Sequence, residues 1–283
     1  MKLEAFSFRG SATGNPEESI LHNAVSVPTS RTSPPSEMKG KETDMRKIAR
    51  KAMTVSAVAV AAAALTAAPA SAAVTDVDVT MAGVTAPANG DVTGASDGNV
   101  GGLNQNRPSA LSCQPDANGP ALSAAGTVRV ENNQNGVDVA SLSSVNFNNP
   151  CTAVPGPVPT NVSAGNLPWG MDVTDPTSGG VTAGKLTGVE IVLDAPSIGC
   201  TVRITGDGAP GYIGGTYTNP AAGSGDPGVL ALSNNGADNN LIVSEIIAGP
   251  CPVSLIQLGD RMTVSGTVDV SGPSSEGPII NAS

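Results

Sequence analysis

Histidine is almost absent from this chain of 283 residues, and its one copy, His22, lies near the amino terminus. Beyond that point the chain cannot use Ser-His-Asp or Cys-His catalysis, imidazole acid–base chemistry or a histidine-ligated zinc ion. The sequence therefore predicts a protein that is not an enzyme, with no catalytic residues, no cofactor and no metal site.

Aromatic residues are also scarce, at 2% of the chain. Beyond residue 72 they are only Phe147, Trp169, Tyr212 and Tyr217. The core must then consist of Val, Leu, Ile and Ala, whose side chains bury less apolar area each. We consider Trp169, Tyr212 and Tyr217 as contacts for a ligand or partner, because exposed aromatic side chains often anchor interfaces. The alternative, which is the commoner role of a lone tryptophan, is packing in the core.

Positive charge is lacking as well. Residues 73–283 contain 5 basic and 18 acidic residues, which gives a formal charge of −13. Nucleic acids and anionic membrane surfaces would repel such a protein. The sequence therefore predicts no nucleic-acid partner and does not identify a partner of another kind.

The amino-terminal quarter of the chain contains the features of an export signal. Met45–Lys51 is basic, Ala52–Ala67 is apolar and rich in alanine, and Ala70–Ala72 forms a small-x-small cleavage site. These features predict a bacterial secretory signal peptide over 45–72, cleaved near Ala72. Residues 1–44 are predicted to be a disordered leader or to follow a start site assigned too far upstream. The mature chain is expected to be extracellular and to have no transmembrane span.

Four cysteines follow the predicted cleavage site, which favours two disulfides in an oxidising compartment. The shortest gap between them is 38 residues, unlike the close spacing of zinc ligands. Asn149–Cys151 and Gly249–Cys251 each end in Pro-Cys, each follow an Asn-rich turn and a strand, and each have one earlier cysteine. This faint repeat favours the pairs Cys113–Cys151 and Cys200–Cys251 over the two other pairings.

Residues beyond 72 have the pattern of short strands separated by turns. Val74–Met81 alternates apolar and polar side chains, as a half-buried edge strand does. No segment here carries a helical apolar stripe. The sequence predicts an all-β fold, an antiparallel sandwich or barrel-like domain stapled by two disulfides. Further predicted strands are Gly126–Glu131, Val137–Phe147, Trp169–Val173, Lys185–Leu193, Thr201–Thr205, Tyr212–Thr218, Val229–Ser233, Leu241–Ile247 and Met262–Val270.

The expected domain organisation follows from these patterns. Residues 73–110 would form one strand and a linker rich in Gly, Asn and Pro. Residues 111–272 would form the all-β domain, and residues 273–283 would be a disordered tail.

Carboxylate side chains are the remaining candidates for catalytic residues. Asp76 and Asp78 share one strand face, where the simplest interpretation is a solvated surface. Asp172 and Asp175 flank a turn near Trp169 and, with Glu190, could serve a polysaccharide hydrolase. The interpretation as turn and surface residues is favoured, because no second aromatic residue lies nearby in the sequence to stack on a sugar.

Five short motifs follow one another along the chain: Cys151, Asn166–Trp169 (N-L-P-W), Gly188–Leu193 (G-V-E-I-V-L), Cys200–Val202 (C-T-V) and Cys251. Together they resemble a known family of secreted bacterial proteins, the PraB-like activators of alkane oxidation. The resemblance covers roughly residues 110–272 and implies a non-enzymatic extracellular protein, surface-active, that helps cells meet hydrophobic substrates. We therefore expect a secreted interaction protein of the cell surface or of a hydrophobic interface. The alternatives are a structural or adhesive surface subunit and, least favoured, the hydrolase.

Overall fold

The structure, a computed structural model, describes residues 74–283. The predicted leader and signal peptide lie outside the described residues. The described chain is all-β with antiparallel pairing throughout, as predicted. Its only helical segments are two single 3-10 turns, η1 (Pro196–Ile198) and η2 (Gly236–Asp238).

Seventeen strands make up the described chain, and many of them match the predicted ranges closely. Their bounds are β1 (Val77–Thr80), β2 (Ala88–Ser96), β3 (Val100–Asn104), β4 (Ala110–Cys113), β5 (Leu122–Val130), β6 (Ala140–Phe147), β7 (Cys151–Val154), β8 (Val158–Gly165), β9 (Trp169–Val173), β10 (Val181–Thr187), β11 (Glu190–Ala195), β12 (Cys200–Gly206), β13 (Tyr212–Thr218), β14 (Gly228–Leu232), β15 (Leu241–Ala248), β16 (Met262–Ser271) and β17 (Ile279–Ala282).

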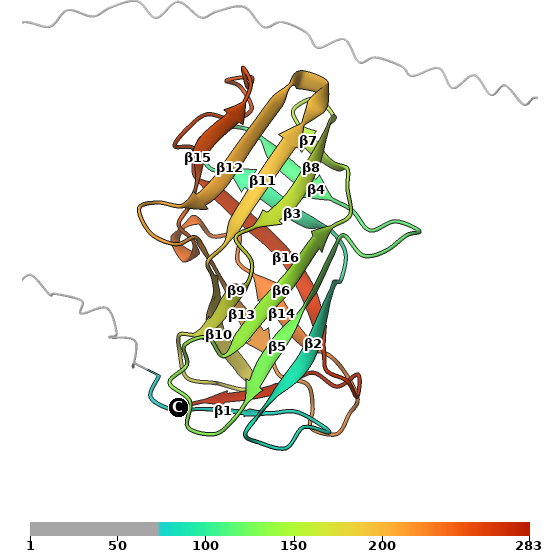
Figure 1. Ribbon diagram of the computed structural model, residues 1–283, viewed down its shortest axis with the longest axis vertical. Coiled ribbons are helices and arrows are strands. Elements are labelled where there is room, and N and C mark those ends of the chain that lie inside the picture. The colour runs from blue at the N-terminus through green and yellow to red at the C-terminus, as the bar shows by residue number, and fades with distance from the viewer. Residues whose placement is uncertain (1–73) are drawn as a thin grey trace, which may run out of the picture. The chain divides into compact units, whose positions relative to one another are not determined.

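Eight strands form a closed ring in the lower half of the molecule in Figure 1. The order is β14-β13-β10-β9-β6-β5-β2-β16, and β14 also pairs with β16, which closes the ring. We call this the lower ring. Closure removes the free sheet edges that an open sheet would expose to other chains.

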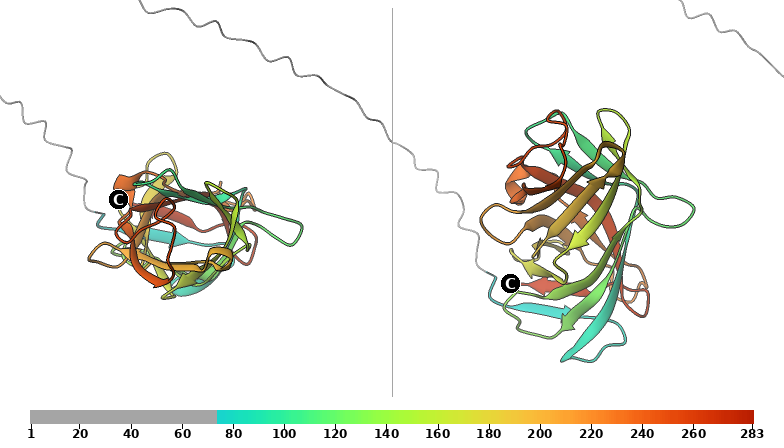
Figure 2. Two further views of the ribbon diagram at one scale, coloured as in Figure 1. Left: turned by 90° about the horizontal axis from the view of Figure 1, so that it is seen from above. Right: turned by 45° about the horizontal axis from the view of Figure 1, so that its top comes forward.

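A second ring stands above the first and is seen from above in Figure 2. Its order is β16-β3-β4-β7-β8-β11-β12-β15, and we call it the upper ring. It closes where β15 meets the residues just before β16. Ile242 bridges Arg261, the Val243 amide donates to the Asp260 carbonyl at 2.9 Å, and the Gly259 amide donates to the Val243 carbonyl at 2.8 Å.

The long strand β16 belongs to both rings. Its first part, Met262–Ser265, pairs with β3 of the upper ring. Its second part pairs with β14 over Gly266–Val270 and with β2 over Val268–Ser271 in the lower ring. The two rings are therefore parts of one continuous hydrogen-bonded sheet.

A two-stranded sheet of β1 and β17 lies across the lower end (Figure 1) and fills the lower ring. Val77, Val79 and Ile280 of this plug are almost fully buried. The prediction of a disordered tail over 273–283 is therefore wrong, because β17 pairs with β1 and buries apolar side chains. The view of β1 as an edge strand is also wrong, since the Val77 and Val79 amides donate on the other side to the Gln134 and Glu131 carbonyls at 2.9 Å each.

The predicted linker within 73–110 is also a set of strands. β2 and β3 lie inside it, and each pairs on both sides. These strands contain glycine, which is uncommon in strands, so the sequence pattern did not indicate them. The glycines have a packing role there. A Cβ on Gly94 would lie only 3.0 Å from a methyl carbon of Val268, so the missing side chain lets β2 approach β16 closely.

Both disulfides have the predicted connectivity, and both lie in the upper ring. Cys113–Cys151 joins the end of β4 to the start of β7. Cys200–Cys251 joins the start of β12 to the loop that follows β15. All four cysteines are paired.

Candidate functional site

The interior of the upper ring contains an apolar hollow. Two small adjacent cavities of about 60 and 40 Å³ lie there. Leu111, Leu193 and Met262 line both cavities. Volumes of this size are well below those of typical sites for small molecules.

Small residues explain why this ring is not filled. An eight-stranded ring is just wide enough for its interior side chains to meet, or to hold one small ligand. Ala110, Ala153 and Ala195 line the first cavity, and Gly101 and Gly102 line the second. The scarcity of aromatic residues thus has a structural consequence, since no large side chain from these positions reaches the centre of the ring.

The loop over 252–260, which we call the capping loop, covers part of this hollow. Leu255 and Ile256 line the first cavity, while Val253 and Leu258 turn outward with exposed fractions of 63% each. The Cys200–Cys251 disulfide fixes the residue that precedes the loop. The loop therefore presents apolar side chains both to the cavity and to the solvent.

An ion pair joins the capping loop to the β3–β4 connection. Arg107 Nε donates to Asp260 Oδ2 at 2.6 Å, and Arg107 also donates to the Val253 carbonyl at 2.7 Å and to the Gln257 side chain. Asn104 Nδ2 donates to the same Asp260 oxygen at 2.8 Å. The Asp260 carboxylate thus joins the two loops by accepting these hydrogen bonds.

Burial and hydrogen bonding act in opposite directions on Asp260. Its burial would raise the pKa of the carboxyl group, but the hydrogen bonds from Arg107, Asn104 and the Gln257 amide, with the positive charge of Arg107, outweigh that effect and hold the pKa below its ordinary value. Asp260 is therefore ionised at neutral pH, and the ion pair is formed.

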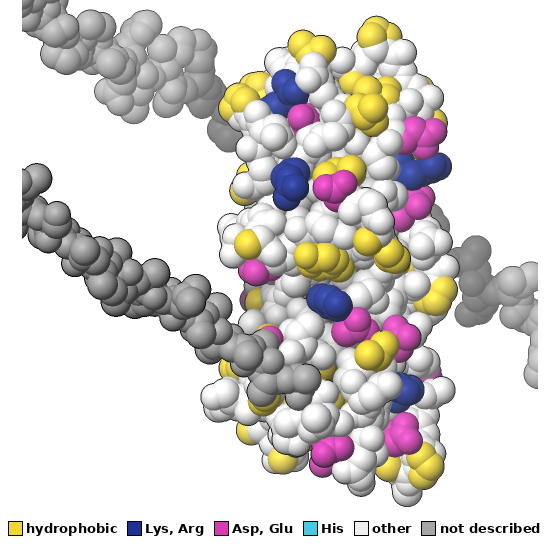
Figure 3. Space-filling model, turned by 90° about the vertical axis from the view of Figure 1, so that its left-hand side faces the viewer, with side chains coloured by type: hydrophobic (Ala, Val, Ile, Leu, Met, Phe, Trp, Pro, Cys, Tyr) yellow, Lys and Arg dark blue, Asp and Glu magenta, His cyan; other side chains and the backbone are white. Residues whose placement is uncertain are grey.

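Exposed hydrophobic side chains gather around the upper ring. Figure 3 shows several of them at the upper end of one face. The lower ring and its plug expose fewer, among them Val137. The exposed large hydrophobic residues of the upper ring are Leu103, Val154, Ile246, Ile247, Val253 and Leu258.

Acidic residues occur in both halves: of the 18 in the described chain, ten lie in the lower ring, the plug and their loops, and eight lie elsewhere. The basic residues of the upper ring, Arg107, Arg203 and Arg261, each lie within 4.0 Å of an acidic side chain, so its charges are largely paired. The two halves therefore differ mainly in their exposed apolar side chains, which are more numerous around the upper ring. The acidic residues of the lower ring, the plug and their loops are Asp76, Asp78, Asp91, Glu131, Asp138, Asp172, Asp175, Asp226, Asp269 and Glu276.

Two of the three aromatic residues predicted as contacts are inside the protein. Trp169 is 3% exposed and its Nε1 donates to the Gly165 carbonyl at 2.9 Å. Tyr217 is 2% exposed and its hydroxyl donates to the Pro278 carbonyl at 2.7 Å. Their role as surface contacts is therefore wrong. They pack in the core, because each finds a backbone acceptor for its polar end.

Tyr212 is the exception, since it is half-buried beside an open groove on the outside of β10, β13 and β14. The Lys185 ammonium lies 5.8 Å from the centre of its ring. Tyr212 therefore remains available for contact, although it lies on the lower ring and away from the apolar hollow.

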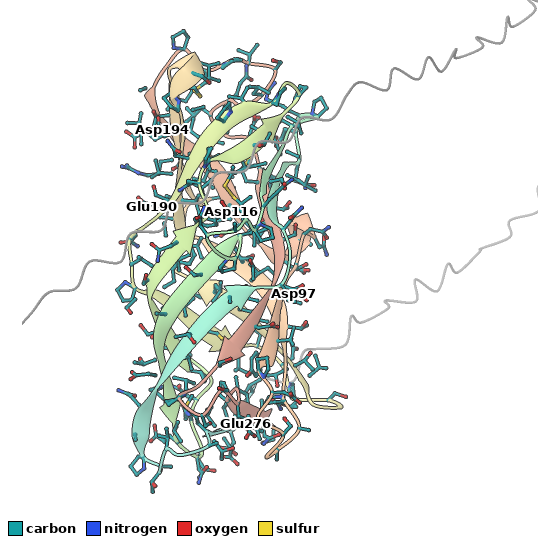
Figure 4. All side chains as sticks on the ribbon, turned by 90° about the vertical axis from the view of Figure 1, so that its right-hand side faces the viewer. Asp97, Asp116, Glu190, Asp194 and Glu276 are labelled. Atoms are coloured by element: carbon teal, nitrogen blue, oxygen red, sulfur yellow. A yellow bond between two sulfur atoms is a disulfide. The ribbon has the colours of Figure 1, made fainter. Side chains whose placement is uncertain are left out.

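The candidate carboxylates are dispersed among separate interactions. Asp172 Oδ1 accepts from the Asp138 amide at 2.9 Å and Asp172 Oδ2 lies 3.7 Å from Lys185 Nζ. Glu190 lies 3.2 Å from the Arg203 guanidinium, in the upper ring where Figure 4 labels it. Because Trp169 is buried, no exposed indole stands beside Asp172 and Asp175 to stack on a sugar.

Asp76 and Asp78 are both exposed at the lower end, and Asp78 accepts from the Asn133 amide at 2.9 Å. Within residues 74–283, no group of three or more His, Cys, Asp or Glu side chains is placed to hold a metal ion. The same residues contain no helix long and apolar enough to cross a membrane.

No protein-family model, no curated protein and no solved structure matches this chain. The site must therefore be interpreted from its own geometry. Sequence reasoning missed the hollow because it depends on which strands neighbour one another, and strands far apart in sequence build it.

Proposed function

We propose that this protein is a secreted, non-catalytic protein that adsorbs to apolar surfaces through its upper ring. The observation that carries the proposal is the number of exposed large apolar side chains around the upper ring, in contrast to the lower ring. An apolar end lowers its free energy by leaving water, at about 25 cal/mol for each Å² buried. The lower ring, with fewer such side chains, stays hydrated and orients the molecule.

The two disulfides support an extracellular location, because such bonds form and persist in oxidising compartments. Export through the signal peptide over 45–72 is part of this proposal. So is the resemblance to the alkane-oxidation activators, whose implied role at hydrophobic substrates suits a molecule with exposed apolar side chains.

Interfacial tension measured at a water–hexadecane boundary tests the proposal. We expect the full chain to lower the tension, and the double variant V253S/L258S to lose most of that effect, because both side chains project from the capping loop. Val137→Ser is the matched control, since Val137 is 51% exposed but lies on the lower ring. The proposal fails if the wild type leaves the tension unchanged, or if the control loses as much as the double variant.

A further inference from the structure

The open groove on the outside of β10, β13 and β14, which we call the outer groove, is large enough for a ligand. Its volume is about 500 Å³, within the range of small-molecule sites. We propose that the outer groove binds a short carbohydrate of about disaccharide size, stacked on the ring of Tyr212. This inference goes beyond the proposed function and does not rest on it, because the groove lies on the lower ring and the capping loop on the upper ring.

A row of small side chains forms the floor of the outer groove. Ala183 of β10 pairs with Thr216 of β13, which pairs in turn with Ala231 of β14. Their chain neighbours Thr182 and Tyr217 are almost fully buried, so the row itself faces outward by the alternation of a strand. Three adjacent strands therefore carry no large side chain at this level, which leaves a depression in the outer wall.

An aromatic ring and an ammonium group border one end of this floor. Tyr212 and Lys185 both line the groove, and Lys185 Nζ lies 5.8 Å from the centre of the Tyr212 ring. Asp172 Oδ2 lies 3.7 Å from the same ammonium nitrogen. The Tyr212 amide donates to the Asn240 side chain at 2.8 Å, which fixes the backbone that carries the ring. The ring is thus positioned at the edge of the groove.

Asp238 borders the groove from the η2 turn. The Ser233 hydroxyl donates to Asp238 Oδ2 at 2.6 Å, and the Asn235 side chain accepts from the Ala237 amide at 3.1 Å within the turn. Gly214 allows the turn to lie against β13, because a Cβ there would stand 2.6 Å from the Asp238 carbonyl oxygen. The hydrogen bond and the close approach together place a carboxylate beside the groove.

These groups match the two kinds of surface that a sugar presents. A sugar ring has an apolar face of C–H groups, which packs on an aromatic ring and on alanine methyl groups. Its edge carries hydroxyl groups that both donate and accept hydrogen bonds. The carboxylates accept such bonds, the Lys185 ammonium donates them, and the exposed Thr216 hydroxyl can do either. A carbohydrate therefore finds a partner for each of its surfaces.

The mixed charge of the groove favours a neutral ligand. Asp175 and Asp238 line it together with Lys185. A positively charged ligand would be attracted by the carboxylates but repelled by the ammonium group, and an anion would meet the reverse. An uncharged sugar avoids both repulsions and uses groups of both signs.

Amide 1H–15N NMR of the full chain measures binding, with maltose, cellobiose and N,N′-diacetylchitobiose as the probes. We expect one or more of them to cause saturable shifts of the Gly214, Thr216 and Ala231 signals, with a Kd of about 1 mM because the site is open to water. The Gly101 and Gly102 signals of the upper ring should not shift. The inference is overturned if no probe shifts the groove signals, or if signals of both rings shift equally.

Substitutions at the edge and on the floor of the groove test the geometry. Tyr212→Ala should weaken binding of the responding disaccharide about tenfold, whereas Tyr212→Phe keeps the ring and should stay within about threefold of the wild type. Ala231→Leu fills the floor and should also weaken binding about tenfold. Ala95→Leu is its matched control, because Ala95 is exposed on β2 and does not line the groove. Tyr212→Ala keeps the test decisive if Ala231→Leu does not fold, and wild-type affinity in Tyr212→Ala overturns the inference.

Salt distinguishes a sugar from a cation in the same groove. Disaccharide binding should change less than about twofold between about 0.05 and 0.5 M sodium chloride, because no ion pair forms. Cadaverine, a diamine, serves as the comparison. If cadaverine binds more tightly than every disaccharide, and if salt and Asp238→Asn both weaken its binding, the groove is a cation site and the inference is wrong.

Discussion

Arg107 and Asp260 lie 153 residues apart in the sequence, yet Arg107 Nε donates to Asp260 Oδ2 at 2.6 Å. This contact joins the two loops at the upper end of the molecule. The ionised carboxyl group of Asp260 also accepts from Asn104 and from the Gln257 amide, so it supports the capping loop beside the backbone contacts that close the upper ring.

Replacing Asp260 should destabilise the protein in a pH-dependent way. Asp260→Ala leaves Arg107, Asn104 and the Gln257 amide without their acceptor, at a cost of about 3 kcal/mol in the free energy of unfolding at pH 7. The folded-state pKa is lowered, so this contribution is complete above pH of about 4 and falls as the pH drops toward the folded value.

Urea unfolding at pH 7 and at low pH measures this effect. The difference in the free energy of unfolding between the wild type and Asp260→Ala should be smaller at low pH. Asp207→Asn is the control, because Asp207 is exposed and its nearest contact to Arg261 is 3.9 Å, so less than about 0.5 kcal/mol is expected. Equal losses at both pH values would contradict the assignment.

Tyr217 should make the lower ring sensitive to alkali. Burial raises the pKa of its hydroxyl group in the folded protein. Stability is therefore retained below the unfolded value of about 10 and lost as the pH rises above it, because only the unfolded chain ionises readily. Tyr217→Phe should cost about 1 kcal/mol at pH 7 through the lost bond to Pro278.

Thermal unfolding from pH 8 to 11 checks this prediction. Tyr217→Phe should lose part of the wild type's alkaline destabilisation, whereas Tyr212→Phe should keep it because Tyr217 is retained. A steep decline that persists in Tyr217→Phe would mean that another group is responsible.

The last strand should be essential for stability. Deleting residues 279–283 removes β17 from the plug and exposes Val77 and Val79, at a cost of about 3–5 kcal/mol. The melting temperature and the binding of a hydrophobic dye report the loss. A disordered tail, in contrast, could be removed without effect, so an unchanged melting temperature would contradict the structure.

The two disulfides should contribute similarly to stability but differ in their local effect. Each closes a loop of 38 or 51 residues, worth about 4 kcal/mol on the chain-entropy account. Replacing Cys200 and Cys251 by alanine should also speed protease cleavage within the capping loop. The matching Cys113/Cys151 double variant should not, and limited proteolysis with mass spectrometry distinguishes the two.

The strands predicted correctly are those whose side chains alone indicate a strand. Trp169–Val173 and Tyr212–Thr218 match β9 and β13 because apolar, β-branched and aromatic residues lie between clear turns. The predicted strand Lys185–Leu193 is instead the end of β10 and the start of β11, since Gly188, with a φ of 72°, turns the chain between them.

The strands that were missed are rich in small or polar residues. β2 reads A-N-G-D-V-T-G-A-S, and its place in the sheet is determined by its neighbours β5 and β16 rather than by its own propensity. The hollow and the capping loop could not be predicted from the sequence either, because they depend on the order of strands around a ring. The burial of Tyr217 was missed because the acceptor of its hydroxyl group, the Pro278 carbonyl, lies 61 residues away in the sequence.

The shared strand β16 determines when the chain can fold. It completes the wall of both rings, and only β17 of the plug follows it. Neither ring can therefore close before β16 takes its place, because β16 pairs with strands of both. One strand thus sets the moment at which both halves of the architecture can form, so the two halves should become stable together rather than one after the other.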